Sequence, residues 1–321
     1  MRLRLVPQDT KWDFFGKSKL TLGFSGVLVI LALISFFAQG LNFGIDFRGG
    51  TTFRTESAQT VDIGGYRDAL APLGLGDITI TEVFDPSFEE DQNVTMIRIQ
   101  AQQGQEAATV DLVANVELAL QAVAPDITFI SVESVGPKVS GELITSAVIA
   151  VLLAIAAVLV YIWLRFEWQF AVGAVAALVH DVVLTIGVFS ALQIRFDLAI
   201  IAALLTIVGY SLNDTVVVFD RVRENLRKFK KMDLKDVLNQ SINETLSRTV
   251  MTSVTTLLAL ISLFVLGGDV IRGFVFAMIW GVIVGTYSSV FVASAVLYRL
   301  GVKRDWSKQD ATAGNQFANI D

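Results

Sequence analysis

The sequence lacks cysteine entirely and contains a single histidine, His180. Disulfides, thiolate metal sites and thiol nucleophiles are therefore excluded, and a zinc site built from histidines is disfavoured. Charged residues are scarce as well: they make up 17% of the 321 residues, against about 25% in soluble proteins. Hydrophobic residues reach 53%, and the mean hydropathy is +0.60. This balance is typical of a protein embedded in a lipid bilayer.

Several motifs of nucleotide- and metal-dependent enzymes are also missing. The sequence contains no Walker A pattern, no glycine-rich phosphate loop and no HExxH pair. ATP hydrolysis and zinc proteolysis are therefore disfavoured. We expect a chain that is not an enzyme and that holds neither a metal ion nor an organic cofactor.

Six apolar stretches are long enough to cross a membrane, because a transmembrane helix needs about 20 mainly apolar residues. We predict spans over residues 20–41, 142–164, 170–192, 198–219, 250–266 and 274–300. The alternative for the first stretch is a cleavable signal peptide. Its apolar run is longer than that of a usual signal peptide, and AQG at residues 38–40 is a loose cleavage site. A retained anchor is therefore favoured.

Basic residues gather in three segments, namely residues 1–19, the 220–249 connection and the tail after residue 300. With six spans these segments lie on one side of the membrane, which the excess of positive charge identifies as the cytoplasm. The same rule explains the basic 220–249 connection, so it does not indicate nucleic-acid binding. Residues 41–140, by contrast, contain 15 acidic and 5 basic residues and are expected on the outer side.

These patterns divide the chain into five parts. They are a cytoplasmic N-terminus (residues 1–19), a first transmembrane helix (20–41), an external domain (42–140), transmembrane helices two to six (141–300) and a cytoplasmic tail (301–321). We therefore predict a polytopic α-helical membrane protein with one external domain between its first and second helices.

The external domain has the pattern of a small α+β fold. β-branched and alternating stretches predict strands, and apolar residues at helical spacing predict helices. The expected elements, in the order strand, helix, strand, strand, helix, strand, cover residues 51–56, 61–73, 78–84, 94–101, 107–123 and 126–135. This βαββαβ order is that of the ferredoxin-like fold. Its acidic residues indicate a solvated surface, with partner binding as the alternative.

An acidic residue, Asp214, falls inside the fourth predicted span. A charge within hydrocarbon is costly and indicates function by default. Burial disfavours the charged carboxylate and a nearby arginine favours it, so Asp214 is suited to changing its protonation state. Tyr210 and Ser211 lie one turn earlier and Asn213 adjoins it, and the two hydroxyl groups could orient the carboxyl group or hold water. The alternative is a structural residue bonded to a neighbouring helix.

Three further polar residues each allow two interpretations. His180 and Asp181 lie in the middle of the third predicted span, where they could form a relay with Asp214 or a buried structural pair. Arg248 precedes a hydroxyl-rich stretch of the fifth span. It could be the counter-charge of Asp214, or an interfacial cation that reaches to the cytoplasmic surface.

Three segments resemble a known family. They read FGIDFRGG at residues 43–50, VGYSLNDTVVVFDRVREN at residues 208–225 and LSRTVMTSVTT at residues 246–256. Together with six spans and one large loop after the first, they are similar to the SecF family of membrane subunits, which belong to the bacterial SecD–SecF preprotein translocase complex. The likeness covers nearly the whole chain.

The resemblance implies a member of the resistance–nodulation–division superfamily, located in the bacterial inner membrane, that promotes protein export with the proton motive force. The implied partners are SecD, YajC, the SecYEG channel and a translocating preprotein, within membrane lipid. A proton is the implied coupling ion, although sodium replaces it in some relatives. The resemblance makes Asp214 and Arg248 the proton-coupling residues. The family motifs also contain Asp46, Arg48, Asp220 and Arg221.

Two other functions stand as alternatives. A small-molecule or lipid exporter of the same superfamily usually carries two six-helix halves and two large external loops in one chain, whereas this chain has one of each. An intramembrane enzyme would need a second catalytic group close to Asp214, and Asp181 is the only other carboxylate candidate in the interior of the predicted spans. Both comparisons favour a subunit of a transport complex.

Overall fold

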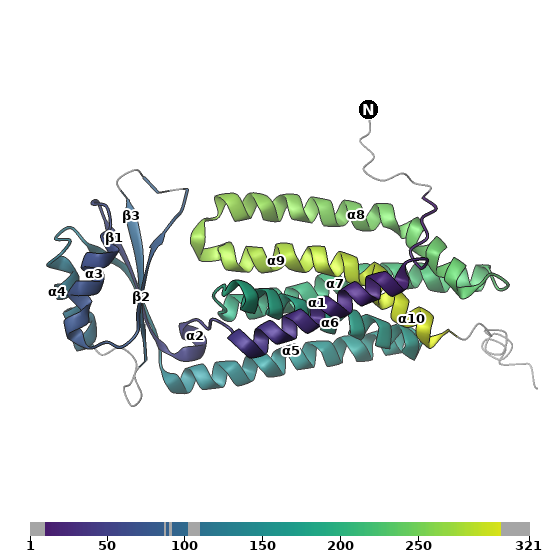
Figure 1. Cartoon of the computed structure of the whole chain (residues 1–321), viewed down its shortest axis with the longest axis horizontal. Coiled ribbons are helices and arrows are strands. Elements are labelled where there is room, and N and C mark those ends of the chain that lie inside the picture. Colours follow the sequence, from purple (N-terminus) through teal and green to yellow (C-terminus); the bar gives the residue numbers. More distant parts are fainter. Residues whose placement is uncertain (1–9, 87, 90–91, 102–109, 303–321) are drawn as a thin grey trace, which may run out of the picture.

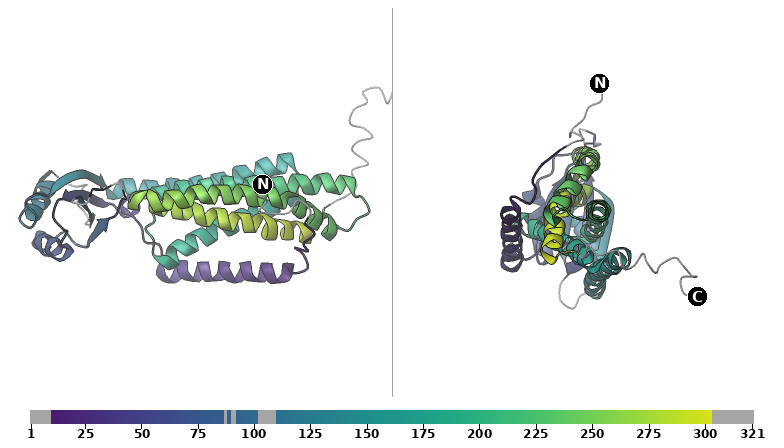
Figure 2. Two further views of the ribbon diagram at one scale, coloured as in Figure 1. Left: turned by 90° about the horizontal axis from the view of Figure 1, so that it is seen from above. Right: turned by 90° about the vertical axis from the view of Figure 1, so that its right-hand side faces the viewer.

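The computed structural model describes residues 10–86, 88–89, 92–101 and 110–302. It is an elongated molecule in which a bundle of long helices lies end to end with a smaller domain built on a β-sheet (Figures 1 and 2). The predictions made for residues 1–9, 107–109 and 303–321, basic residues of both chain ends included, fall outside the described residues.

Within these ranges, six segments are helical, apolar and long enough to span a membrane. Five are single helices: α1 (Ser18–Gln39), α5 (Pro137–Arg165), α6 (Trp168–Leu192), α7 (Leu198–Lys228) and α8 (Leu234–Leu266). The sixth consists of α9 (Gly268–Ser288), a π-helical turn η2 (Ser289–Ala293) and α10 (Ser294–Leu300). The predicted polytopic α-helical architecture is confirmed.

Three of the six segments form the inside of the bundle. The apolar stretches of α6 and of α9 with α10 are mostly buried within the chain, and that of α7 is nearly half buried. Those of α1, α5 and α8 are mostly exposed. Exposed faces of this kind are suited to lipid or to the helices of another membrane protein. Polar groups on the inner three segments are instead shielded by the chain itself.

The fourth and fifth spans differ from the prediction in length. They were expected to end at residue 219 and to begin at residue 250, yet α7 continues to Lys228 and α8 begins at Leu234. The additional turns are amphipathic, because Val222 and Leu226 of α7 lie in one buried cluster with Val237 of α8. A criterion of about 20 apolar residues misses such turns, since their outer faces are charged.

The smaller domain is a four-stranded sheet covered by helices on one face (Figure 1). Its elements are β1 (Gly50–Ser57), α3 (Ile63–Leu70) with the 3-10 turn η1 (Ala71–Leu73), β2 (Ile78–Val83), β3 (Asn93–Gln100), α4 (Val110–Gln121) and β4 (Thr128–Val135). The strands lie in the order β2-β3-β1-β4 and all pairs are antiparallel. The predicted βαββαβ ferredoxin-like order is confirmed.

The domain has its own hydrophobic core between the sheet and its two helices. Phe53 of β1 and Ile97 of β3 are fully buried there, together with Leu70 of α3 and Leu120 of α4. The opposite face of the sheet is turned toward the bundle (Figure 1). The fold therefore places the open face of the sheet over one end of the membrane helices.

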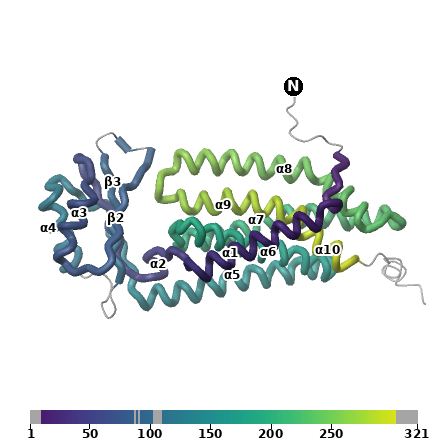
Figure 3. The backbone as a smooth tube through the Cα atoms, viewed as in Figure 1, coloured from purple at the N-terminus to yellow at the C-terminus, as the bar shows by residue number. Residues whose placement is uncertain are grey.

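Two short connections join the domain to the bundle. After α1 the chain passes through the single-turn helix α2 (Ile45–Arg48) into β1, and from β4 it enters α5 at once (Figure 3). The two connections lie side by side, because Gly50 at the start of β1 is paired with Val135 at the end of β4. The two connections thus form a single narrow base beneath the sheet.

We expect Gly50→Ala to destabilise the external domain strongly. Gly50 has a φ of 139°, and an added Cβ would overlap the carbonyl oxygen of Ile99 in the neighbouring strand. Gly74 is the matched control, since it has a φ of 62° but its Cβ would meet nothing within 4 Å. Gly74→Ala should lower the stability of the domain only by the cost of holding an alanine in a left-handed backbone conformation, about 1–2 kcal/mol. Hydrogen exchange of the β1 amides measures both variants, and equal protection in the two would contradict the expectation.

Candidate functional site

Two acidic residues are buried inside the bundle. Asp181 of α6 is 1% exposed and Asp214 of α7 is 3% exposed. A buried carboxylate has lost its hydration, so its charged form requires compensating hydrogen bonds or an opposite charge. The two residues differ sharply in how many such partners they have.

Asp181 is bonded by side chains from three helices. The Ser211 hydroxyl of α7 donates to Oδ2 at 2.6 Å, and the Ser288 hydroxyl of α9 donates to the same oxygen at 2.8 Å. His180 places Nδ1 at 2.9 Å from Oδ1. Asp181 therefore acts as a shared acceptor that ties α6, α7 and α9 together.

Asp214 has far fewer partners. Its Oδ2 is buried and has no hydrogen-bond partner among the described residues. Arg248 of α8 is close enough to act on it electrostatically, but the two side chains form no ion pair in the described part of the chain, and Arg248 is exposed. Asp214 is thus a shielded carboxyl group whose charge is incompletely compensated.

The hydroxyl groups expected around Asp214 are placed differently. Ser211 was expected to orient Asp214, but its hydroxyl donates to Asp181 instead. The Tyr210 hydroxyl is buried without a hydrogen-bond partner in the described residues, and Asn213 is exposed. Ser211 and Asp214 are neighbours on the surface of α7, but the carboxyl group of Asp181 on α6 lies within hydrogen-bond distance of the Ser211 hydroxyl and accepts its hydrogen bond. The structure therefore links Ser211 and His180 to Asp181.

The family-motif residues lie at opposite ends of the bundle. At the end remote from the sheet, Arg221 bonds Glu224 at 2.6 Å and Glu244 of α8 at 2.5 Å. Asp220 pairs there with Arg165 of α5 at 3.4 Å, and both are well exposed. These contacts fasten α7 to its neighbours. Asp46 and Arg48 lie on α2, beneath the sheet, where Arg48 is exposed.

One member of the Asp181 cluster, Ser288, is missing from the residues predicted from the sequence. Ser288 was not singled out, because a lone hydroxyl in an apolar span usually bonds its own helix backbone. Ser288 does this, donating also to the Gly285 carbonyl at 3.2 Å, but it reaches Asp181 as well. It directly precedes the π-helical turn η2, a deviation that is frequent at functional sites. The available signal was the group Ser288, Ser289 and Ser294 on the last span.

Metal binding finds no support in this geometry. No group of three or more His, Asp or Glu side chains converges in the part of the chain that the structure describes. The site contains two carboxyl groups. That of Asp181 on α6 is fully hydrogen-bonded, and that of Asp214, three residues after Ser211 on α7, can gain or lose a proton.

Comparison with known proteins assigns the chain to a family. The family described as "Protein export membrane protein SecD/SecF, C-terminal" matches residues 115–303, and the "SecD/SecF GG Motif" matches residues 34–61. The protein translocase subunit SecF of Cereibacter sphaeroides is 62% identical over 320 residues, which make up 100% of this chain and 99% of the relative. The chain belongs to the SecD/SecF family.

Other members of the SecD/SecF family extend the comparison. The protein translocase subunit SecF of Ketogulonicigenium vulgare is 53% identical and covers 98% of both chains. SecDF of Thermus thermophilus, described as a translocon-associated membrane protein, has a TM-score of 0.81 at 35% identity over 94% of this chain. This chain spans only 40% of that SecDF chain. The family assignment gives the chain a role in protein export as a multi-pass membrane protein.

Proposed function

We propose that this member of the SecD/SecF family promotes protein export with the proton motive force, and that Asp214 takes up and releases the proton. The contrast between the two buried carboxylates carries this proposal. The acceptors of Asp181 are occupied by Ser211, Ser288 and His180, whereas Oδ2 of Asp214 has no donor among the described residues. Protonation of Asp214 therefore breaks no side-chain hydrogen bond at that oxygen and removes an uncompensated charge.

Arg248 provides the electrostatic response in this proposal. An arginine keeps its positive charge throughout, so its attraction to Asp214 exists only while the carboxyl group is ionised. Proton uptake removes the attraction and allows α7 and α8 to shift against each other. Proton release on the other side of the membrane restores it. No covalent bond is made or broken in this cycle, which is the behaviour of a coupling device rather than an enzyme.

The proton motive force is large enough for such a shift. One elementary charge that crosses a potential of about 100 mV gains about 2.3 kcal/mol. A free energy of this size biases an equilibrium between two arrangements by about fifty-fold. Repeated cycles of that bias suffice to favour outward movement of a preprotein that the external domain contacts.

The proposed orientation follows from charge. The bundle end opposite the sheet carries both ends of the described chain (Figure 1) and a concentration of basic residues. These are Lys17, Lys19, Arg221, Arg223, Arg227, Lys228, Lys230, Lys231 and Lys235. By the positive-inside rule this end, with both termini, lies in the cytoplasm. The external domain then lies on the outer face of the bacterial inner membrane.

The proposed partner in the membrane is SecD. The chain matches two-fifths of the SecDF protein of Thermus thermophilus, which supports a second subunit that supplies the remainder. The exposed apolar faces of α1, α5 and α8 are available for its helices and for lipid. YajC, the SecYEG channel and the preprotein complete the assembly that we propose.

The proton-driven step can be tested in membrane vesicles that translocate a preprotein. We expect the part of translocation that depends on this chain to disappear when a protonophore collapses the gradient, and to persist when potassium replaces sodium. A proton needs only the Asp214 carboxyl group, whereas a sodium ion needs several oxygen ligands around it. Chain-dependent translocation that survives the protonophore would contradict the proposal. Translocation that stops when potassium replaces sodium would identify sodium as the coupling ion.

A further inference from the structure

The segment that leads into the external domain is bonded to the start of α7. The Gly44 N–H donates to the Phe196 carbonyl at 2.8 Å, and the Phe196 N–H donates to the Asn42 carbonyl at 2.8 Å. One turn further on, Oδ2 of Asp46 accepts the N–H of Leu198 at 3.0 Å. Leu198 is the first residue of α7. The family motif therefore holds the helix that carries Asp214.

Aromatic packing reinforces this contact. Phe47 of α2 lies with its ring centroid 5.7 Å from Phe43 and 6.0 Å from Phe196, and Phe189 of α6 lies 6.0 Å from Phe196. Phe47, Phe189 and Phe196 are buried. Interlocked rings have few alternative arrangements, so α2 follows the start of α7 when either one moves.

On its other side α2 is fixed to the sheet. The Gly49 N–H donates to the Ile45 carbonyl at 2.8 Å, and the Ala101 N–H donates to the Gly49 carbonyl at 3.3 Å. The next residue, Gly50, begins β1, which lies between β3 and β4 in the sheet. The start of α7 is thus hydrogen-bonded to α2, and α2 continues through Gly49 directly into the central strand β1.

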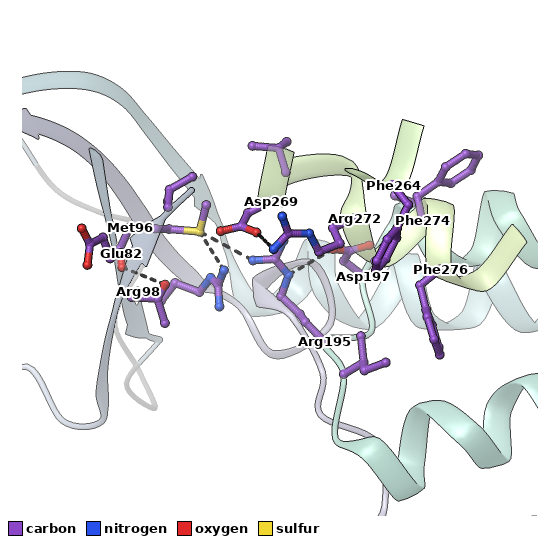
Figure 4. Close-up of a pocket in the computed structure, with 16 residues that line it drawn as sticks. Glu82, Met96, Arg98, Arg195, Asp197, Phe264, Asp269, Arg272, Phe274 and Phe276 are labelled. Atoms are coloured by element: carbon purple, nitrogen blue, oxygen red, sulfur yellow. Dashed lines mark hydrogen bonds and ion pairs between the residues drawn. The ribbon is translucent and has the colours of Figure 1, made fainter. Parts of the chain in front are cut away.

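A second contact joins the domain to the bundle, beside an open space between the sheet and the helices. A cavity of about 450 Å³ lies between β2 and β3 on one side and the α6–α7 and α8–α9 connections on the other (Figure 4). At its edge Asp269, at the start of α9, accepts the Phe84 N–H at 2.7 Å and donates its own N–H to the Phe84 carbonyl at 2.9 Å. The domain is therefore held at two places, the α2 base and the Phe84–Asp269 contact, with the cavity between them.

We propose that Asp46 is the positioning residue that transmits movement between α7 and the external domain; this rests on the proposed function of Asp214. α7 is one unbroken helix from Leu198 to Lys228, and Asp214 lies sixteen residues after Leu198. At 1.5 Å per residue the two are about 24 Å apart along the axis. A shift of α7 on protonation of Asp214 reaches its first turn, and Asp46 passes that shift to the sheet.

Spin-label distances in the full chain test this transmission. The chain has no cysteine, so Asp68→Cys on α3 and Leu192→Cys at the end of α6 are the only labelled sites. Both residues are exposed. Asp214→Asn imitates the protonated state, and we expect it to shift the distance between the labels. Asp46→Ala should remove that shift, and Asp46→Asn should restore it, because the amide oxygen still accepts the Leu198 N–H.

Asp197→Ala is the matched control. Asp197 also caps α7, accepting the Ile200 N–H at 3.3 Å, and its carboxylate pairs with Arg195 of the same connection. A general loosening of the helix start would abolish the shift in both alanine variants, whereas transmission through Asp46 predicts that Asp197→Ala keeps it. A shift that survives Asp46→Ala, or that is lost in Asp197→Ala as well, overturns the proposal. If Asp214→Asn does not change the distance between the labels when Asp46 and Asp197 are both intact, the proposed function is overturned, and this inference with it.

Discussion

Asp214→Asn should abolish the proton-driven part of protein export while the chain accumulates in the membrane at its normal level. Asparagine keeps the shape of the carboxyl group but neither takes up nor releases a proton. Folding should tolerate the change, because Oδ2 of Asp214 has no hydrogen-bond partner in the described structure and a neutral group is easier to bury. The bias of about fifty-fold that one proton draws from about 100 mV is then lost.

The experiment compares translocation with and without a proton gradient in vesicles that contain equal amounts of each variant. Asp220→Asn is the matched control, since it makes the same chemical change on the same helix at an exposed site paired only with Arg165 among the described residues. An exposed pair of this kind contributes about 0–1 kcal/mol, so export should stay close to normal. Gradient-dependent export at the normal rate in Asp214→Asn would rule out Asp214 as the proton carrier.

The architecture could be predicted from the sequence because it depends on local signals. Apolar length alone locates the six spans, and alternation with turn residues locates the strands of the external domain. Those signals fail where a helix leaves the membrane. Val222 and Val237 extend α7 and α8 by packing against partners distant in sequence, within a segment whose charge resembles that of a loop.

The arrangement around the carboxylates could be predicted only in part, since it depends on helix rotation. Asp214 and Asp181 both stand out as acidic residues in apolar spans. The residues next to them in the sequence, however, do not reveal that Asp181 is fully hydrogen-bonded and Asp214 is not. That difference arises where Ser211 of α7 and Ser288 of α9 converge on one oxygen of Asp181. The bond between Asp46 and Leu198 likewise joins residues 152 positions apart, which no local pattern reveals.

Asp181→Ala should be the most destabilising single change in the bundle. It removes the acceptor shared by Ser211, Ser288 and His180, and it leaves their polar groups in an apolar interior. Each buried polar group that is left without its partner costs about 1–3 kcal/mol, and three groups are affected. Individual bonds between membrane helices are weaker, about 0.6–2 kcal/mol, so Ser211→Ala and Ser288→Ala should each cost only that much. Thermal unfolding of the purified chain in detergent measures the series.

The same series separates a structural role of Asp181 from a role in proton transfer. Asp181→Asn keeps one acceptor oxygen but cannot take up or release a proton, so it should be less destabilising than Asp181→Ala. If Asp181 only ties the helices together, this variant exports protein in proportion to the amount of folded chain and responds to the proton gradient as before. If it folds normally but no longer responds to the gradient, then Asp181 carries protons too, and Ser211, which donates to it one turn before Asp214, becomes the bridge between the two carboxyl groups.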